Sequence, residues 1–135
     1  MLGREVVDVE EIRVLIVDDQ EPYRRAMAAV VAATEGFAVV GIVTTGEESL
    51  ESAARLHPDL VLMDVNLPGI DGVAATRRLL EEPDAPVVVL LSTYDVDQVD
   101  IEGSGAAAYL AKAELGPDRL SATWHAARGG LRDSG

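Results

Sequence analysis

The sequence contains no cysteine and only two histidines, His57 and His125, among its 135 residues. Without thiols the chain has neither a disulfide framework nor a thiolate metal site, and two histidines are too few for a histidine-built zinc site. Any metal ion that binds here should therefore be a hard cation held by oxygen ligands. No apolar stretch approaches the roughly 20 residues of a membrane helix, and residues 1–11 are too polar for a signal peptide. We therefore expect a cytoplasmic protein without membrane contact.

Basic residues are also scarce, because 11 Lys and Arg residues stand against 24 acidic ones and give a formal net charge of -13. Nucleic-acid binding draws much of its affinity from neutralising phosphates, so this charge opposes direct contact of the chain with DNA or RNA. A solvated acidic surface accounts for most of these side chains. The length and the 48% hydrophobic content fit one domain with a self-sufficient core.

Apolar runs alternate with helical segments along the chain. The runs are nearly uninterrupted, which is typical of strands that are covered on both faces of a parallel sheet. We predict strands at 12–17, 38–43, 60–64, 87–91 and 106–110, and helices at 23–33, 45–57, 72–82, 95–103 and 117–128. The helix at 95–103 has poor propensity, and Gly129 and Gly130 are expected to end the last helix. Residues 1–11 are interpreted as a loose leader, 12–130 as the domain and 131–135 as a tail.

Acidic and polar side chains follow the predicted strands at their ends. Asp18 and Asp19 follow the first strand, Asp64 ends the third, Ser92 follows the fourth and Lys112 comes shortly after the fifth. Ligands of such sheets bind beyond the carboxyl ends of the strands, so these side chains are expected to converge. Two carboxylates about 4 Å apart repel by about 4 kcal/mol at an effective dielectric near 20. The three acids therefore need a cation, and magnesium, which prefers oxygen ligands, fits best.

A set of motifs carries a family resemblance. Asp18-Asp19, the stretch 62–72 (Leu-Met-Asp-Val-Asn-Leu-Pro-Gly-Ile-Asp-Gly), Ser92-Thr93 and 109–112 (Tyr-Leu-Ala-Lys) resemble the receiver domain of two-component response regulators. The resemblance covers residues 12–130 and is closest to receivers of LuxR-type regulators and of small single-domain response regulators. It implies an α/β fold, a flavodoxin-like doubly wound five-stranded parallel sheet in the order 2-1-3-4-5 with five helices.

The resemblance also implies roles for the acids. Asp64 would accept a phosphoryl group from a sensor histidine kinase. Asp19 would bind magnesium directly, Asp18 would bind it through water or act as a base-like neighbour, and Asn66 would contribute its main-chain carbonyl. The transfer would be self-catalysed and followed by autodephosphorylation, without a separate enzyme activity.

Three further residues receive roles by the same resemblance. The Ser92 hydroxyl and the Lys112 ammonium would bind the phosphoryl oxygens. Tyr109 would turn inward when the Ser92 hydroxyl is drawn to the phosphate, so Ser92 and Tyr109 would form the switch. We expect the switch to act through the fourth helix, the fifth strand and the fifth helix on a downstream protein or in a homodimer.

Each residue also has a plainer structural interpretation. Asp18 is compatible with a helix N-cap, Asp64 with an Asx turn, Ser92 with a cap of the following helix and Lys112 with a solvated surface amine. Tyr109 fits ordinary half-buried packing.

Three alternative functions stay open at this point. The chain could be the receiver half of a LuxR-type DNA-binding regulator, since no output segment follows Gly135. An α/β phosphatase is the second, although no Asp-x-Asp follows the first strand, and no phosphate-binding glycine loop follows it either. The third is an interaction module that has lost phosphorylation.

Overall fold

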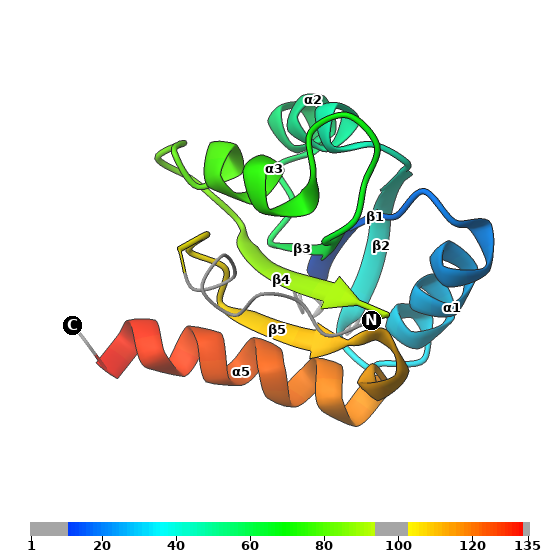
Figure 1. The fold of residues 1–135 in the computed structure, drawn as a ribbon. Coiled ribbons are helices and arrows are strands. Elements are labelled where there is room, and N and C mark those ends of the chain that lie inside the picture. Colours follow the sequence, from blue (N-terminus) through cyan, green and yellow to red (C-terminus); the bar gives the residue numbers. More distant parts are fainter. Residues whose placement is uncertain (1–10, 94–102, 134–135) are drawn as a thin grey trace, which may run out of the picture.

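The computed structural model describes residues 11–93 and 103–133, and its core is a sheet of five parallel strands in the order β2-β1-β3-β4-β5 (Figure 1). The strands are β1 (Ile12–Val17), β2 (Phe37–Val43), β3 (Leu60–Asp64), β4 (Val87–Ser92) and β5 (Ala108–Ala111). The helices are α1 (Glu21–Ala32), α2 (Gly46–Leu56), α3 (Gly72–Leu79) and α5 (Pro117–Asp133), with a 3-10 turn η2 (Lys112–Glu114). The predicted flavodoxin-like sheet and its strand order are confirmed.

The predicted helices differ from the structure near the C-terminus of the chain. The predicted fourth helix, 95–103, lies outside the described residues except for its last one. The prediction that Gly129 and Gly130 end the last helix is wrong, because α5 continues to Asp133. Glycine ends a helix when it adopts a left-handed conformation, and Gly129 does not have the positive φ that Gly36 shows at 89°. In a right-handed conformation glycine weakens a helix by about 1 kcal/mol without ending it.

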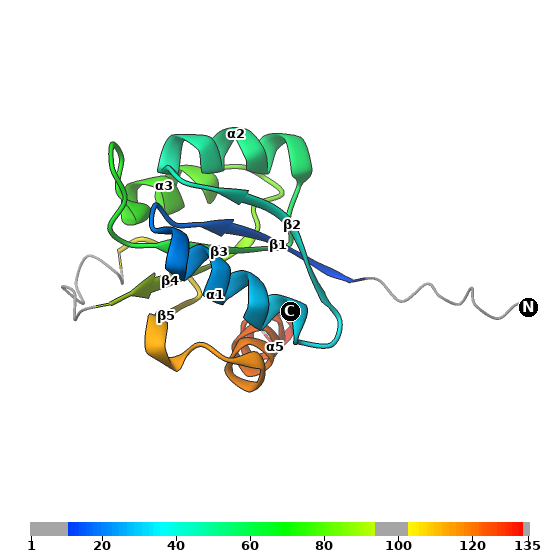
Figure 2. The ribbon, with the colours of Figure 1, turned by 90° about the vertical axis from the view of Figure 1, so that its right-hand side faces the viewer.

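Helices cover both faces of the sheet. α1 and α5 lie on one face, and α2 and α3 lie on the other (Figure 2). On the first face Met27 and Val31 of α1 and Leu120 and Trp124 of α5 pack against the strands. On the second face the buried side chains of α3 do the same. Full burial of one such side chain stabilises the fold by about 1.5–3 kcal/mol, which explains why uninterrupted apolar strands form here.

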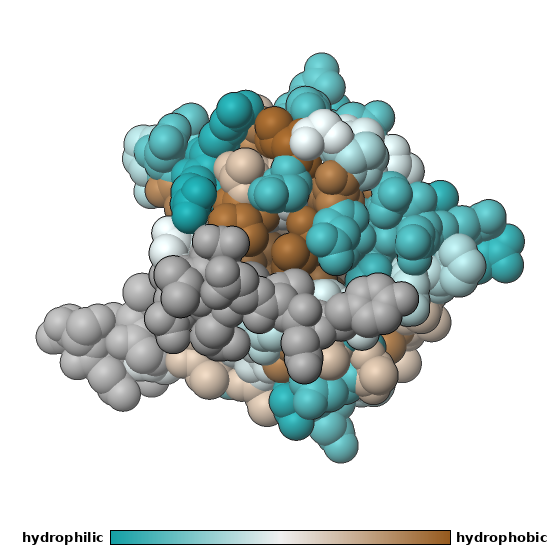
Figure 3. All heavy atoms as spheres, viewed as in Figure 1, coloured by the Kyte–Doolittle hydropathy of each residue, from teal (hydrophilic) through white to brown (hydrophobic). Residues whose placement is uncertain are grey.

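The central strand β3 is buried at all five positions, so its last residue, Asp64, is a buried acid. β2 lies at one edge of the sheet, and Ile42 on this strand is 47% exposed. On the face seen in Figure 1, hydrophobic residues are also visible between α3 and β4, with hydrophilic residues around them (Figure 3). Of the helices described, none combines the length and apolar character that a membrane crossing requires.

Candidate functional site at the carboxyl edge of the sheet

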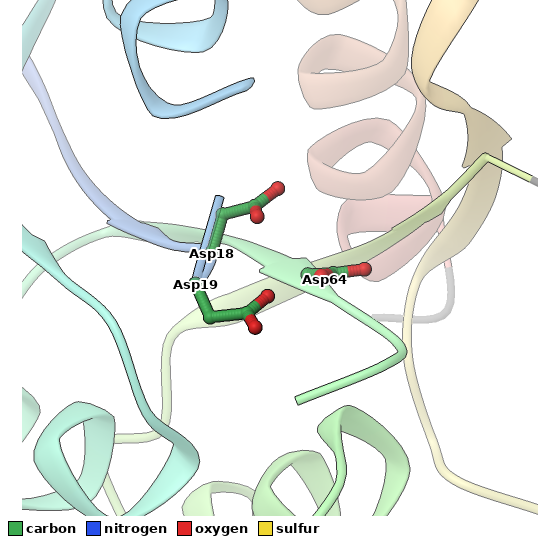
Figure 4. A group of neighbouring side chains, drawn as sticks. All are labelled: Asp18, Asp19 and Asp64. Atoms are coloured by element: carbon green, nitrogen blue, oxygen red, sulfur yellow. The ribbon is translucent and has the colours of Figure 1, made fainter. Parts of the chain in front are cut away.

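Three carboxyl groups meet where β1 and β3 end. Asp18 and Asp19 follow β1 and Asp64 ends β3, and their side chains point to the same side of the sheet edge (Figure 4). One oxygen from each lies within 4.8 Å of the others. Asp18 is fully buried and Asp64 is 4% exposed, whereas Asp19 is exposed. The predicted convergence of the three acids is therefore present in the structure.

Main-chain hydrogen bonds hold these strand ends in place. The Asp18 amide donates to the carbonyl of Val43 at 3.2 Å, which ties the end of β1 to the end of β2. The guanidinium of Arg24 donates to the Asp18 carbonyl at 2.9 Å from the first turns of α1. Beyond β3, the amide of Val65 donates to the carbonyl of Leu91 at 2.9 Å. These bonds tie the ends of β1 and β3 to β2, α1 and β4.

Lys112 reaches into the acidic cluster from η2. Its Nζ lies 2.6 Å from Asp18 Oδ2 and 3.6 Å from Asp64 Oδ2, and the lysine side chain is 6% exposed. The preceding main chain is fixed because the Ala111 amide donates to a carboxylate oxygen of Glu114 at 3.2 Å. Lys112 is therefore a buried counter-ion of the two acids, and its interpretation as a solvated surface amine is wrong.

The pKa of Asp64 is raised from 3.8 to about 6. Burial is the largest cause, because a carboxylate loses hydration inside the protein, and the negative charge of Asp18 adds to it. The positive charge of Lys112 and the hydrogen bond from the Asn66 amide, at 3.2 Å from Asp64 Oδ1, act in the opposite direction. A partly desolvated carboxylate that is ionised at neutral pH is a suitable nucleophile.

The donor set fits a hard divalent cation. Three carboxylates within 4.8 Å supply more negative charge than the one ammonium beside them neutralises. Within the described part of the chain Asp18 Oδ2 accepts no hydrogen bond, although it is buried. The Lys112 ammonium, 2.6 Å from Asp18 Oδ2, is its counter-ion. Lone pairs of this oxygen are still free to bind a metal ion. Oxygen-only ligation with carboxylates is what magnesium takes in proteins.

Ser92 and Tyr109 lie on the neighbouring strands β4 and β5. Ser92 is fully buried, ends β4 and pairs with Ala111, the residue before Lys112. Tyr109 of β5 pairs with Leu90 of β4 and is half-buried against the core on the α3 side. Side chains alternate along a strand, so Ser92 and Tyr109 belong to the same face of the sheet. This placement agrees with the proposed switch and also with ordinary packing of Tyr109.

The remaining structural interpretations have mixed outcomes. Asp18 is not the N-cap of α1, because that position is Gln20, whose own side chain makes no capping hydrogen bond. Asp18 instead accepts from the Gln20 amide at 2.9 Å. Asp64 does accept the Asn66 amide, as an Asx turn requires. This turn and the acidic cluster coexist, since the two oxygens of Asp64 face different partners.

Two residues at the site were not predicted. A Cβ at Gly72 would lie 2.1 Å from the Asp64 carbonyl oxygen, so only glycine lets α3 begin this close to the strand end. The Asp71-Gly72 pair was a usable signal, because Asp71 caps α3 through the Ala74 amide at 2.8 Å. Tyr23 is the second residue, since Lys112 Nζ lies 3.8 Å from its ring centroid. No local pattern joins residues so far apart in sequence.

A doubly wound α/β protein with an acidic cluster at the carboxyl edge of its sheet is the class that this fold and site define. The family model of the response regulator receiver domain matches residues 14–124. The chain therefore belongs to the receiver domain family of two-component response regulators, in which phosphorylation and magnesium binding are typical.

Relatives and solved structures agree with this assignment. The chain is 46% identical over 103 residues to the response regulator GacA of Pseudomonas viridiflava, covering 75% of this chain and 48% of GacA. It is 36% identical over 120 residues to the transcriptional regulatory protein LiaR of Bacillus subtilis, covering 87% of this chain and 57% of LiaR. The NarL receiver domain of Mycobacterium tuberculosis superimposes with a TM-score of 0.81 at 26% identity, covering 89% of this chain and 98% of that domain.

A third relative is named as an enzyme. The chain is 40% identical over 88 residues to a protein-glutamate methylesterase/protein-glutamine glutaminase of Geobacter metallireducens, covering 65% of this chain and 25% of that protein. This chain thus spans about half of GacA and a quarter of the methylesterase.

Proposed function

We propose that this chain is a phosphorylation-controlled switch that accepts a phosphoryl group on Asp64 from a sensor histidine kinase. The observation that carries the proposal is the buried Asp64 carboxylate with the Lys112 ammonium 3.6 Å from one of its oxygens, inside a cluster of three acids. A nucleophile with an adjacent cation at a strand end is the arrangement that phosphoryl transfer requires, because positioning and charge stabilisation supply most of its catalysis. Membership of the receiver family supports the same reaction.

In the proposed reaction a carboxylate oxygen of Asp64 attacks phosphorus while the bond from phosphorus to the kinase imidazole breaks. The imidazole nitrogen keeps the electron pair of that bond, and an acyl phosphate forms on Asp64. Lys112 donates to the phosphoryl oxygens, and the buried Ser92 hydroxyl binds them after transfer. Asp18, Asp19, Asp64 and the main-chain carbonyl of Asn66 would hold magnesium, which would supply positive charge against the phosphoryl oxygens.

In this proposal the chain catalyses only this phosphoryl transfer and the hydrolysis of its own acyl phosphate. The methylesterase relative is four times as long as its match to this chain, and the proposal does not assign its activity to this chain. We place the reaction in the cytoplasm, where ATP-dependent kinases act, and assign it to a domain at 12–130 with a leader at 1–11 and a tail at 131–135.

For the output we propose that Ser92 and Tyr109 couple the phosphoryl group to a protein-interaction surface. The shared face of these two side chains on neighbouring strands supports this role. The surface would comprise the fourth helix, whose predicted segment lies outside the described residues, together with β5 and α5. Its partner would be a downstream protein or a second copy of the chain.

A second candidate is that the chain is the receiver part of a DNA-binding regulator. The similarity to the transcriptional regulatory protein LiaR, of which the match covers 57%, favours this candidate. The negative charge of -13 means that any DNA contact would come from another domain.

The test is to incubate the protein with acetyl phosphate and magnesium and to measure its intact mass. We expect one added phosphoryl group on the wild type and none on Asp64→Asn. Asp19→Asn, which keeps the shape but removes a metal ligand, should slow the reaction strongly. Equal labelling of Asp64→Asn and the wild type would overturn the assignment.

A further inference from the structure

The ammonium of Lys112 has an aromatic neighbour as well as its two acids. Nζ lies 3.8 Å from the centroid of the Tyr23 ring, 2.6 Å from Asp18 Oδ2 and 3.6 Å from Asp64 Oδ2. Tyr23 is the third residue of α1, so this contact joins the first turn of α1 to η2 across the carboxyl edge of the sheet. A cation this close to an aromatic face is attracted by the electron density of the ring.

We infer that Tyr23 is a positioning residue that holds the Lys112 ammonium where it meets the phosphoryl group on Asp64. The inference rests on the proposed function of Asp64. Lys112 has a flexible four-carbon stem and a point charge, so its usefulness as a donor depends on what restrains it. The acid Asp18 attracts the ammonium, but this attraction weakens when a cation shares the Asp18 carboxylate. The ring is a neutral restraint, and its attraction does not depend on the charge of the acids.

The surroundings of the lysine stem explain why a restraint is needed. A pocket of about 30 Å³ borders Lys112 and is also lined by Tyr23, Met27, Leu91 and Leu115, among other apolar residues. Removal of the Tyr23 ring would enlarge this pocket on the side of the ammonium. The stem would then have room to swing away from Asp64, so the ring both attracts the ammonium and fills space that the stem would otherwise enter.

The contact separates the role of the ring from that of the hydroxyl. Nζ lies over the ring centroid and not beside the phenolic oxygen. Tyr23→Phe should therefore keep the function, whereas Tyr23→Leu and Tyr23→Met keep an apolar side chain and lose the aromatic face. Two different truncations guard against a folding defect in one of them. Phe37→Leu is the matched control, because it removes a core ring that packs against Trp124 at 6.5 Å and faces the other end of the sheet.

The experiment measures the rate of phosphorylation by acetyl phosphate at saturating magnesium for each folded variant. We expect Tyr23→Leu and Tyr23→Met to react about tenfold more slowly than the wild type, since a desolvated cation–π contact is worth about one factor of ten. Tyr23→Phe should react within about twofold of the wild type. Phe37→Leu should melt at a lower temperature and react at the wild-type rate.

A double-mutant cycle tests whether Tyr23 acts through Lys112. In the Lys112→Ala background, Tyr23→Leu should cause no further loss of rate, because the restrained group is gone. A structural role of the ring would slow both backgrounds equally. Such additivity, or a rate for Tyr23→Leu equal to that of the wild type, would overturn the inference.

An NMR measurement gives a readout that is independent of phosphorylation. The ε-methylene protons of Lys112 should resonate upfield in the wild type and in Tyr23→Phe, because they lie over a ring, and should return to ordinary shifts in Tyr23→Leu. Ordinary shifts in the wild type would overturn the inference. If the shifts are upfield but no phosphoryl group is added to the wild type, the proposed function fails while the Tyr23 contact stands.

Discussion

Charged side chains have different surroundings at the two ends of the sheet. At the amino ends, the Arg13 guanidinium donates to the carbonyls of Leu56 and His57 at 2.6 and 2.9 Å, and the Asp59 carboxylate accepts the Arg13 amide at 2.9 Å. At the carboxyl ends, Asp18 Oδ2 is buried without a hydrogen bond, and the pKa of Asp64 is raised to about 6. The same strands therefore begin in hydrogen-bonded polar contacts and end in a cluster of acids that outnumber their one ammonium partner.

This difference separates groups that stabilise the fold from groups that serve the reaction. Arg13 caps the last carbonyls of α2 and joins it to β1, which is a structural use of charge. The acids at the other end repel one another, and that repulsion is relieved when a cation binds. Three carboxyl groups that share one ammonium leave excess negative charge at this edge, which points to a bound cation.

The largest expected contrast between the two ends is in reaction rate. Lys112→Ala should slow phosphorylation by acetyl phosphate about 100-fold, because one positioned donor to a developing charge typically contributes this much. Arg13→Ala should leave the rate unchanged, since its side chain lies at the amino ends. Rates from intact-mass time courses check both variants, and equal effects at the two ends would contradict the separation.

The pH dependence of stability should report Asp64 at the carboxyl end. Its folded pKa of about 6 exceeds the ordinary 3.8, so the folded state binds the proton more tightly than the unfolded state. This tighter proton binding contributes up to about 3 kcal/mol to the free energy of unfolding. The contribution is fully present below about pH 4 and is lost as pH rises through about 6.

Urea unfolding from pH 4 to pH 7 without magnesium, on the wild type and Asp64→Asn, isolates this contribution. Asp64→Asn lacks the titrating group, so its free energy of unfolding should increase relative to that of the wild type as pH rises. A constant difference between the two proteins across this interval would show that burial and Asp18 do not destabilise the Asp64 carboxylate.

At the amino ends a substitution should change stability and nothing else. Arg13→Ala should lower the free energy of unfolding by about 2 kcal/mol, because two carbonyls at the end of α2 lose a charged donor. Arg55→Ala, on the last turn of α2 and exposed, is the matched control and should change it by less than about 0.5 kcal/mol. Chemical denaturation checks both, and similar values for the two variants would contradict the capping role.

The smallest expected effect is stabilisation by magnesium. At ten times its dissociation constant, magnesium should raise the free energy of unfolding by about 1.4 kcal/mol, because it binds the folded state. Asp64→Asn and Asp19→Asn should lose most of this gain, whereas Arg13→Ala should keep it. Thermal unfolding with and without magnesium measures the gain, and its absence in the wild type would count against the three acids as a cation site.

The sequence alone predicts the sheet well, because its strands are apolar on both faces and can be buried only in the centre of a layered fold. β3 at Leu60–Asp64 agrees with the predicted 60–64 at both ends. The end of α5 could not be predicted from Gly129, since a glycine permits a helix to end and does not require it. Tertiary packing of Leu120 and Trp124 decides where that helix is held.

The acids of the site were predictable for the same reason as the strands, since Asp18 and Asp64 directly follow apolar runs and Asp19 is the next residue after Asp18. The burial of Lys112 was not, because its depth depends on the turn of η2 and on a ring contributed by α1. The requirement for glycine at position 72 also depends on distance, here to the Asp64 carbonyl oxygen. Local patterns therefore indicate which groups are present, and packing determines how closely they approach.

The most direct test of the account is to locate the phosphoryl group. After reaction with acetyl phosphate and magnesium, borohydride reduction converts an aspartyl phosphate to homoserine, and peptide mass spectrometry identifies its position. We predict homoserine at position 64 in the presence of magnesium and none when the metal is chelated. Homoserine at another acid, or an unmodified Asp64 under saturating conditions, would contradict the claim that the carboxyl edge forms one site around this residue.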